Sequence, residues 1–266
     1  MRLGTDGWFR FVVTTLIAAG ATSALWGDTI VATFDAAGVQ AATGSALCGK
    51  STACWVGEET FNSWNGTVPF TTTYSTLLDS VGGLTGGISG IYTGGLTESN
   101  NYEWGGAGGT GYYPTVTDSS YTINLTVSGT TPGVNYFGLW VSAIDADNEL
   151  QFYNGNTLLY TFTAAYFINN GLGACPSASN AFCGNPNNGE DTNEQFAFMN
   201  FYDVTGYFTK IVVTEADTSG FETDNHTVGY IQNIVPVGTV FLPEPGSFAL
   251  VTLGALIVMG LRRRRD

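Results

Sequence analysis

Short runs in which apolar and polar residues alternate constrain the fold of this chain more than any other feature. Between residues 28 and 236 these runs are separated by clusters of Gly, Asn, Ser and Thr, and no sustained 3.6-residue period occurs. A period of two residues indicates strands with one buried face, so few helices are expected. The expected strands cover residues 28–34, 121–127, 134–144, 149–154, 157–163, 196–203, 208–216 and 226–237.

Two local details follow from this pattern. In the run 157–163, Leu158, Tyr160 and Phe162 occupy alternate positions, which places them on one face of the expected strand. The preceding triplet 154–156 reads Asn-Gly-Asn. Asn and Gly tolerate positive φ angles, so a tight hairpin is expected at this triplet.

Composition and strand number together predict the fold class. The chain has 266 residues, of which 36 are glycine and 44% are hydrophobic, so it is too apolar for disorder and too rich in turns for a helical bundle. We expect one all-β domain over residues 25–240, built as a two-sheet antiparallel sandwich that is jelly-roll-like. An up-and-down barrel is the alternative.

The N-terminal segment, residues 1–24, has the order of parts found in secretory signal peptides. Arg2 and Arg10 precede an apolar stretch that begins at Phe11, and small residues follow it. We therefore expect a signal helix that directs export and is cleaved between Ala21 and Ala24. An uncleaved anchor is the alternative, although the apolar stretch is short for a membrane span.

The C-terminal segment, residues 241–266, reads as a membrane helix with a basic end. Phe248 to Leu261 contain no charged residue, and Arg262, Arg263, Arg264 and Arg265 follow directly. Because cytoplasmic flanks of membrane helices are enriched in arginine, a transmembrane helix with its arginines in the cytoplasm is expected.

This segment also resembles a known sorting signal. Pro243, Glu244 and Pro245, followed by the apolar helix and the four arginines, resemble the PEP-CTERM segment of exported proteins in Gram-negative bacteria. The resemblance implies that an exosortase is a partner and that it recognises the tripeptide. It also implies a transient stay in the inner membrane, followed by delivery to the cell surface or the extracellular space.

A second resemblance concerns the body of the chain. The stretch 136–159, YFGLWVSAIDADNELQFYNGNTLL, and the stretch 220–231, GFETDNHTVGYI, resemble the jelly-roll body of many PEP-CTERM surface proteins. They are also similar to galactose-binding-like carbohydrate modules. The resemblance implies a jelly-roll fold and identifies no sugar-reading residue.

The charge of the body excludes one class of partner. Between residues 25 and 243 there are two lysines and 19 acidic residues, which gives a net charge of −17. A surface of this sign repels a phosphate backbone, so nucleic acid is not expected as a partner.

The four cysteines are expected to form disulfides, because an exported protein reaches an oxidising compartment. Three pairings are open from the sequence alone. The two local ones, Cys48 with Cys54 and Cys175 with Cys183, are favoured because short loops close easily. A zinc site is the alternative, but the spacings C-x5-C and C-x7-C exceed those of cysteine zinc sites.

Candidate catalytic groups are few. His226 is the one histidine of the sequence, and it follows Asp224 and Asn225. A catalytic Ser-His-Asp set that includes His226 is one interpretation, but no G-x-S-x-G elbow occurs in the sequence. The favoured interpretation is a histidine at the surface or at a sheet edge. The glycine-rich segments lack the lysine of a P-loop, so we interpret them as surface turns.

Two groups of residues are candidates for ligand binding. Asp145, Asp147 and Glu149 alternate at the end of an expected strand and offer oxygen ligands for a structural calcium ion. A solvated acidic turn is the alternative. Tyr102, Trp104, Tyr112 and Tyr113 lie in a glycine-rich segment, where aromatic rings can stack on sugars or cover the end of a sandwich.

These observations predict an exported, exosortase-processed surface or extracellular-matrix protein that is structural or adhesive and not an enzyme. The alternative is a carbohydrate-binding module that docks on exopolysaccharide. Ice binding and hydrolysis are weaker alternatives. Ice binding would require flat Thr-x-Thr arrays, of which only the segment 71–76, TTTYST, gives a hint.

Overall fold

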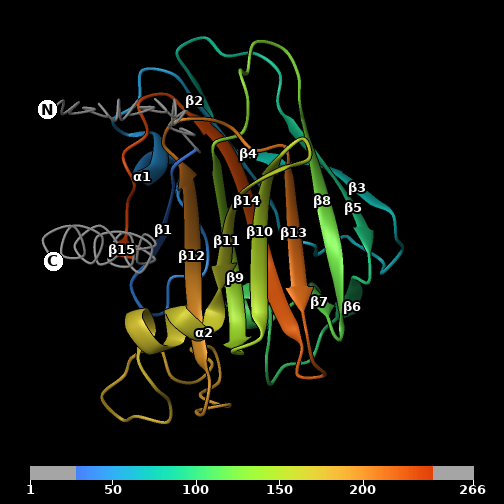
Figure 1. Cartoon of the computed structure of the whole chain (residues 1–266), viewed down its shortest axis with the longest axis vertical. Coiled ribbons are helices and arrows are strands. Elements are labelled where there is room, and N and C mark those ends of the chain that lie inside the picture. The colour runs from blue at the N-terminus through green and yellow to red at the C-terminus, as the bar shows by residue number, and fades with distance from the viewer. Residues whose placement is uncertain (1–27, 242–266) are drawn as a thin grey trace, which may run out of the picture.

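The structure, a computed structural model, describes residues 28–241, and these form two antiparallel sheets packed face to face (Figure 1). Sheet A has the order β15 (Thr239–Phe241), β1 (Ile30–Phe34), β12 (Gln195–Asp203), β9 (Tyr136–Ile144), β14 (Phe221–Ile231), β2 (Cys54–Glu59) and β4 (Ser75–Val81). Two further strands of sheet A are β7 (Tyr113–Val116), which pairs with β14, and β6 (Thr97–Ser99), which pairs with β7. Sheet B has the order β11 (Thr157–Thr163), β10 (Asn148–Asn154), β13 (Lys210–Glu215), β8 (Ser119–Val127), β5 (Ile88–Gly94) and β3 (Phe70–Thr73). The predicted two-sheet antiparallel sandwich is confirmed.

Helical structure in the described part of the chain is limited to short pieces. These are α1 (Gly44–Cys48), a 3₁₀ turn η1 (Ala107–Gly109), α2 (Ala164–Phe167) and a π-helical turn η2 (Ile168–Leu172) that continues α2. α2 lies at the lower end of the molecule in Figure 1. Within residues 28–241 no helix combines the length and the apolar composition needed to cross a bilayer. The expected signal segment 1–24, the Pro243–Pro245 triplet and Arg262–Arg265 lie outside the described residues.

Seven of the eight strands expected from the sequence are present, each within two residues of the predicted ends. The hairpin at the Asn-Gly-Asn triplet is also confirmed, because Gly155 has a φ of 57° between β10 and β11. Strands β2 to β7 and β15 were not predicted. Several of them are short or rich in Gly and Thr, so the apolar alternation that marks a strand is weak in them.

The eighth expected strand was placed wrongly. We expected residues 226–237, whereas β14 runs from Phe221 to Ile231 and residues 232–237 leave the sheet. The predicted strand left out Glu222 and Asp224, but both lie in β14 and are buried, at 6% and 3% exposure. Between Asp224 and Thr227 the register shifts, and Asn225 has a φ of 48°. This bulge adds one residue and turns His226 toward the interior between the sheets.

One face assignment also differs from the prediction. Leu158 was expected beside Tyr160 and Phe162, but a register shift between Phe152 and Tyr153 leaves Leu158 opposite Tyr153. Leu158 is 48% exposed, whereas Phe162 is buried. The bulge changes which alternate positions face the core, which the local sequence does not reveal.

The main core lies between the two sheets. It is rich in aromatic rings: Phe152 of sheet B packs against Phe201 of sheet A at 4.9 Å, and Phe162 packs edge-on against Phe201 at 5.3 Å between ring centroids. Ring pairs at these separations contribute attraction beyond the area they bury. The sandwich is therefore held together by side chains from both sheets.

Sheet A is buried on its outer face as well. All nine residues of β9 and all nine of β12 are buried, which an ordinary sandwich strand with one solvated face would not show. The second apolar cluster on this face includes Tyr136, Trp140, Phe198 and, from the α1 region, Leu47. The segments that cover this face carry the cavities described below.

Candidate functional site

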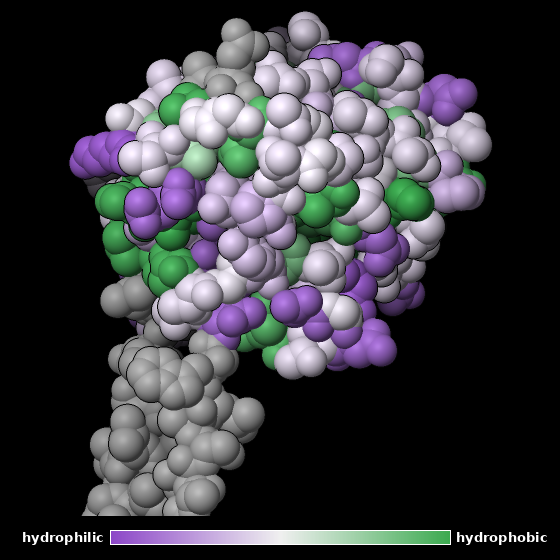
Figure 2. All heavy atoms as spheres, turned by 90° about the horizontal axis from the view of Figure 1, so that it is seen from above, coloured by the Kyte–Doolittle hydropathy of each residue, from purple (hydrophilic) through white to green (hydrophobic). Residues whose placement is uncertain are grey.

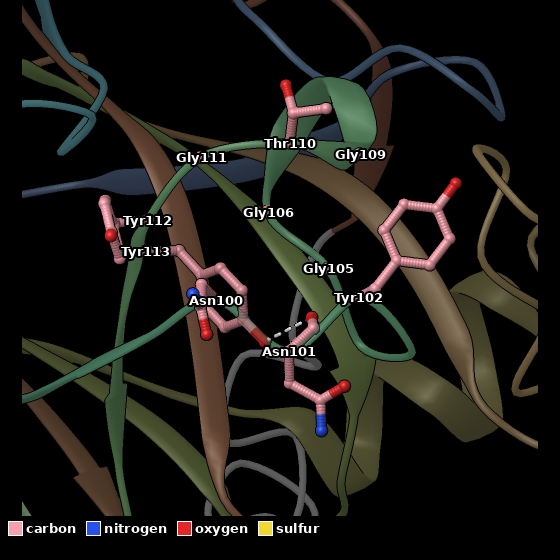
Figure 3. Close-up of a pocket in the computed structure, with 10 residues that line it drawn as sticks. All are labelled: Asn100, Asn101, Tyr102, Gly105, Gly106, Gly109, Thr110, Gly111, Tyr112 and Tyr113. Carbon is pink, nitrogen blue, oxygen red and sulfur yellow. Dashed lines mark hydrogen bonds between the residues drawn. The ribbon is translucent and has the colours of Figure 1, made fainter.

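The connection between β6 and β7, residues 100–112, forms a cavity of about 400 Å³ together with the first residue of β7. Figure 3 shows the rings of Tyr102 and Tyr112 on opposite sides of this cavity, with the ring of Tyr113 and the amides of Asn100 and Asn101 between them. The remaining lining residues are Gly105, Gly106, Gly109, Thr110 and Gly111. The cavity therefore combines aromatic surface with amide groups.

Bonds within the loop hold it in this shape. The Tyr113 hydroxyl donates to the backbone oxygen of Asn101 at 2.9 Å, and the Gly105 N–H donates to the same oxygen at 2.9 Å. Burial raises the pKa of Tyr113 to about 12, so its hydroxyl stays protonated and remains a donor. Gly111 has a φ of 96°, and a Cβ there would overlap the Asn62 side chain, so only glycine fits this position.

Side chains far away in the sequence anchor the loop from outside. Asp224 Oδ2 accepts from the Ala107 N–H at 2.8 Å, and Gln40 Oε1 accepts from the Gly108 N–H at 2.6 Å. Asn185 Nδ2 donates to the Glu103 carbonyl at 3.0 Å, and Asn188 Nδ2 donates to the Tyr102 carbonyl at 2.9 Å. These four contacts bind the backbone of the loop and do not involve the rings of Tyr102 and Tyr112.

Two carboxyl groups lie beneath this loop. Glu222 accepts from the Thr115 hydroxyl at 3.2 Å, and Asp224 also accepts from the Asn225 N–H at 2.7 Å. Burial raises the pKa of Glu222 to about 7 and that of Asp224 to about 8. Both groups are therefore largely or partly protonated at neutral pH, which limits the negative charge under the loop.

The four aromatic residues singled out from the sequence divide into two kinds. Tyr102, Trp104 and Tyr112 are 55%, 36% and 39% exposed, whereas Tyr113 is 1% exposed and supports the loop. Tyr102, Tyr112 and Tyr113 line the cavity, but Trp104 does not. Sequence reasoning missed Asn100 and Asn101, because adjacent asparagines read as a turn signal rather than as ligand donors.

The acidic residues proposed for calcium are only partly brought together. Carboxylate oxygens of Asp147, Glu215 and Asp217 lie within 4.8 Å of one another. Burial raises the pKa of Asp145, and the nearby carboxylates of Asp217, Asp191 and Asp147 raise it further. Glu149 instead accepts from Gln151 Nε2 at 2.8 Å and does not join that group. Glu215 and Asp217 were not singled out, because they follow Asp147 by about 70 positions in the sequence.

His226 lies in the interior and is fully buried, so its predicted place at the surface or at a sheet edge is wrong. Its Nδ1 is 3.0 Å from the Tyr92 hydroxyl, and its Nε2 is 3.0 Å from Thr223 Oγ1. Burial lowers its pKa to about 3. Both ring nitrogens are thus occupied by neutral partners, and the carboxylate and serine of a Ser-His-Asp set do not contact them.

The cysteines pair as the local spacing predicted. Cys48 is bonded to Cys54 and Cys175 to Cys183. The first bridge joins α1 to the start of β2, and the second closes the segment between η2 and β12. Each bridge therefore fixes a segment that packs on the sandwich.

No protein-family model matches this chain, and no curated protein and no solved structure matches it.

Proposed function

We propose that this chain is an exported, non-catalytic cell-surface or extracellular-matrix protein with an adhesive role, sorted by an exosortase. The two disulfides support export, because such bonds persist in oxidising compartments. The strand order supports a jelly-roll arrangement: β8, β9 and β10 lie in sheets B, A and B in turn, and β12, β13 and β14 in sheets A, B and A. The signal segment 1–24 and the Pro243-Glu244-Pro245 tail supply the sorting part of the proposal.

The adhesive role consists in docking on a neutral polysaccharide through the loop 100–112. One observation carries this step: Tyr102 and Tyr112 flank an open cavity on a loop whose backbone is anchored by Asp224, Gln40 and Asn185. Exposed rings on a pre-formed loop bind with little loss of conformational entropy. A neutral ligand is indicated because the body carries a net charge of −17, which would repel an acidic polysaccharide.

The end seen in Figure 2, which is the upper end in Figure 1, shows mainly pale surface with hydrophobic and hydrophilic side chains scattered over it. Scattered apolar side chains are ordinary on a protein surface. In the β6–β7 loop, two of the three exposed rings, those of Tyr102 and Tyr112, line one cavity.

A glycan array of neutral polysaccharides tests the docking step. The double variant Tyr102→Ala/Tyr112→Ala should lose binding by about tenfold or more, since stacking of each ring is a large part of such contacts. Tyr207, which is 38% exposed and lies outside the loop, supplies the matched control Tyr207→Ala, which should bind as the wild type does. Equal binding by the double variant and the control would refute the loop as the contact.

The sorting step has its own test. Replacing Pro243-Glu244-Pro245 by Ala-Ala-Ala should leave the full-length C-terminus in the inner membrane, because two prolines hold an extended segment that a protease can grip. Removing residues 248–266 should instead release the body early, because the apolar helix and its arginines are gone. If the triplet variant is processed and reaches the surface normally, the segment is only an anchor.

A further inference from the structure

Strand β11 forms one edge of sheet B, where it pairs with β10 and with no other described strand (Figure 1). Its seven residues read TLLYTFT and include no charged residue, no proline and no glycine. Edge strands carry unpaired backbone N–H and C=O groups, and most proteins protect them from other chains with charges, prolines or a short length. β11 has none of these three protections.

The other edge strands of the described sheets are protected. β15 has three residues and β3 has four. β6 has three residues with Glu98 at its centre. β4 has seven residues, but its sequence includes Asp79, and its pairing with β2 shifts register twice. Among residues 28–241, β11 is therefore the one long edge strand without charge.

A bulge interrupts β11 near its start and leaves the rest of the strand regular. Leu159 has no opposite residue on β10, but from Tyr160 to Thr163 each residue faces one residue of β10 in turn. The regular part is fixed from the interior, because the Phe162 ring packs against Phe201 at 5.3 Å and against Phe167 at 5.5 Å between ring centroids. Its backbone thus presents a pre-formed edge.

Charged groups near β11 differ between its two ends. At the C-terminal end Thr163 faces Glu149, and Asp147 lies in the turn just before β10. Near the N-terminal end the ring of Tyr153 carries Lys210 Nζ at 4.1 Å from its centroid. Antiparallel pairing of two such edges brings the acidic end of each copy toward the lysine end of the other, whereas parallel pairing would bring the two acidic ends together.

A second copy of this chain suits this edge better than a flexible peptide. A rigid edge loses little conformational entropy on pairing, whereas a disordered segment must first be ordered. The body carries a net charge of −17, so two copies repel each other over most of their surfaces. A contact between them is therefore expected where neither copy has a charge, as at β11.

We propose that two copies of this chain associate by antiparallel pairing of their β11 strands, which joins their B sheets into one continuous sheet. The N–H and C=O groups of residues 160–163 that point away from β10 bond across a two-fold axis. Such a contact is small and weak by itself, but many copies on one cell surface raise its effective strength. It does not involve the loop 100–112 and is independent of the sugar docking proposed above.

Sedimentation velocity of the full chain in mild detergent tests the association, at protein concentrations from about 10 μM to about 1 mM, the range of weak contacts. The wild type should shift from monomer toward dimer as its concentration rises. Added sodium chloride should strengthen the association, because it screens the repulsion between two acidic bodies. A wild type that stays monomeric throughout, or an association that salt weakens, would overturn the proposal.

Thr161→Glu is the blocking variant, and Thr122→Glu is its matched control. Thr161 faces Gln151, and Val212 and Thr122 continue the same row across sheet B, all four being half-buried. Thr161→Glu places like charges of two copies close together at the edge and should weaken the association about tenfold or more. Thr122→Glu makes the same change on β8, away from the edge, and should associate as the wild type does.

Unfolding curves of both variants check that each is folded, and hydrogen exchange locates the contact. Raising the protein concentration should slow amide exchange in residues 157–163 and leave β3, the other edge of sheet B, unchanged. Equal association by the two variants, or slowing confined to other segments, would show that β11 is not the contact. Tyr102→Ala/Tyr112→Ala should associate normally, so loss of sugar binding and loss of self-association are distinguishable.

Discussion

His226 Nδ1 and the Tyr92 hydroxyl oxygen lie 3.0 Å apart in the interior between the two sheets. The contact belongs to a continuous chain of buried polar groups. Tyr92 bonds to the Tyr74 hydroxyl at 2.8 Å, and Thr223 lies 3.0 Å from both His226 Nε2 and the Tyr121 hydroxyl. Because Tyr92 and Tyr121 belong to sheet B and His226 to sheet A, this chain fixes how the sheets face each other.

Replacing His226 by Phe should lower the free energy of unfolding by about 1–3 kcal/mol at pH 7, because the Tyr92 and Thr223 hydroxyls lose a buried partner. The variant should also change the acid response. The folded-state pKa of about 3 lies below the usual value of 6.5, so the unfolded state binds the extra proton and the wild type loses stability as the pH falls from 6.5 toward 3. The loss is about 1.4 kcal/mol per pH unit from this group.

Urea unfolding at pH 7 and pH 5 measures both effects. The difference between wild type and His226→Phe should shrink at pH 5, because only the wild type carries the histidine. A difference that stays constant with pH would mean that His226 takes up its proton in the folded protein as readily as in the unfolded chain.

Asp224 should give the opposite pH dependence. Its folded-state pKa of about 8 lies above its usual 3.8, so the folded state holds a proton that the unfolded state has lost. Stability should therefore fall as the pH rises from about 4 to 8, by about 1.4 kcal/mol per unit from this group. Asp224→Asn keeps an acceptor for the Ala107 N–H and has no carboxyl group to ionise. The variant should therefore lose less stability than the wild type as the pH rises.

The measurement is the unfolding free energy at pH 5 and pH 8. Glu103→Gln, which changes an exposed carboxylate of the same loop, serves as the matched control. If Asp224→Asn loses as much stability at pH 8 as the wild type does, the Asp224 carboxylate is charged in the folded protein. It would then be stabilised by the hydrogen bonds that it accepts from the Ala107 and Asn225 N–H groups.

Opening either disulfide should destabilise the protein by about 2 kcal/mol, because each closes a short loop in the unfolded chain. Thermal unfolding of the double variants Cys48→Ser/Cys54→Ser and Cys175→Ser/Cys183→Ser measures the loss for each bridge. Free thiols found by mass spectrometry in the exported protein would contradict the assignment.

If the carboxylates of Asp147, Glu215 and Asp217 hold a calcium ion, calcium should raise the melting temperature, since a ligand of the folded state stabilises it by mass action. Asp217→Asn should abolish the rise. Glu149→Gln should keep it, because Glu149 bonds to Gln151 instead. An identical melting curve with calcium and with EDTA would show that these carboxylates bind no calcium and form a solvated acidic turn.

Part of the candidate site was visible in the sequence. The glycine-rich segment with Tyr102, Tyr112 and Tyr113 was singled out, and the structure places all three around one cavity. Which ring is free and which is buried was not visible, because it depends on the Asn101 carbonyl that takes the Tyr113 hydroxyl. A second cavity, lined by residues of α1, was missed entirely, since two of its other lining residues, Asp35 and Asn200, are 165 positions apart in the sequence.

By itself, the sequence determined the features that depend on near neighbours in the chain. The positions of seven strands and the turn at Gly155 follow from residues a few positions apart, and short spacing favoured the two disulfides that the structure shows. Only the tertiary structure decided the contacts between distant segments. Asn185 reaches Glu103 across 82 positions and Asn187 bonds to Gln40 across 147, and the bulge at Asn225 turns His226 inward. Such contacts depend on the order and register of the strands. Burial of both faces of sheet A sets this order and register, and no local sequence pattern does.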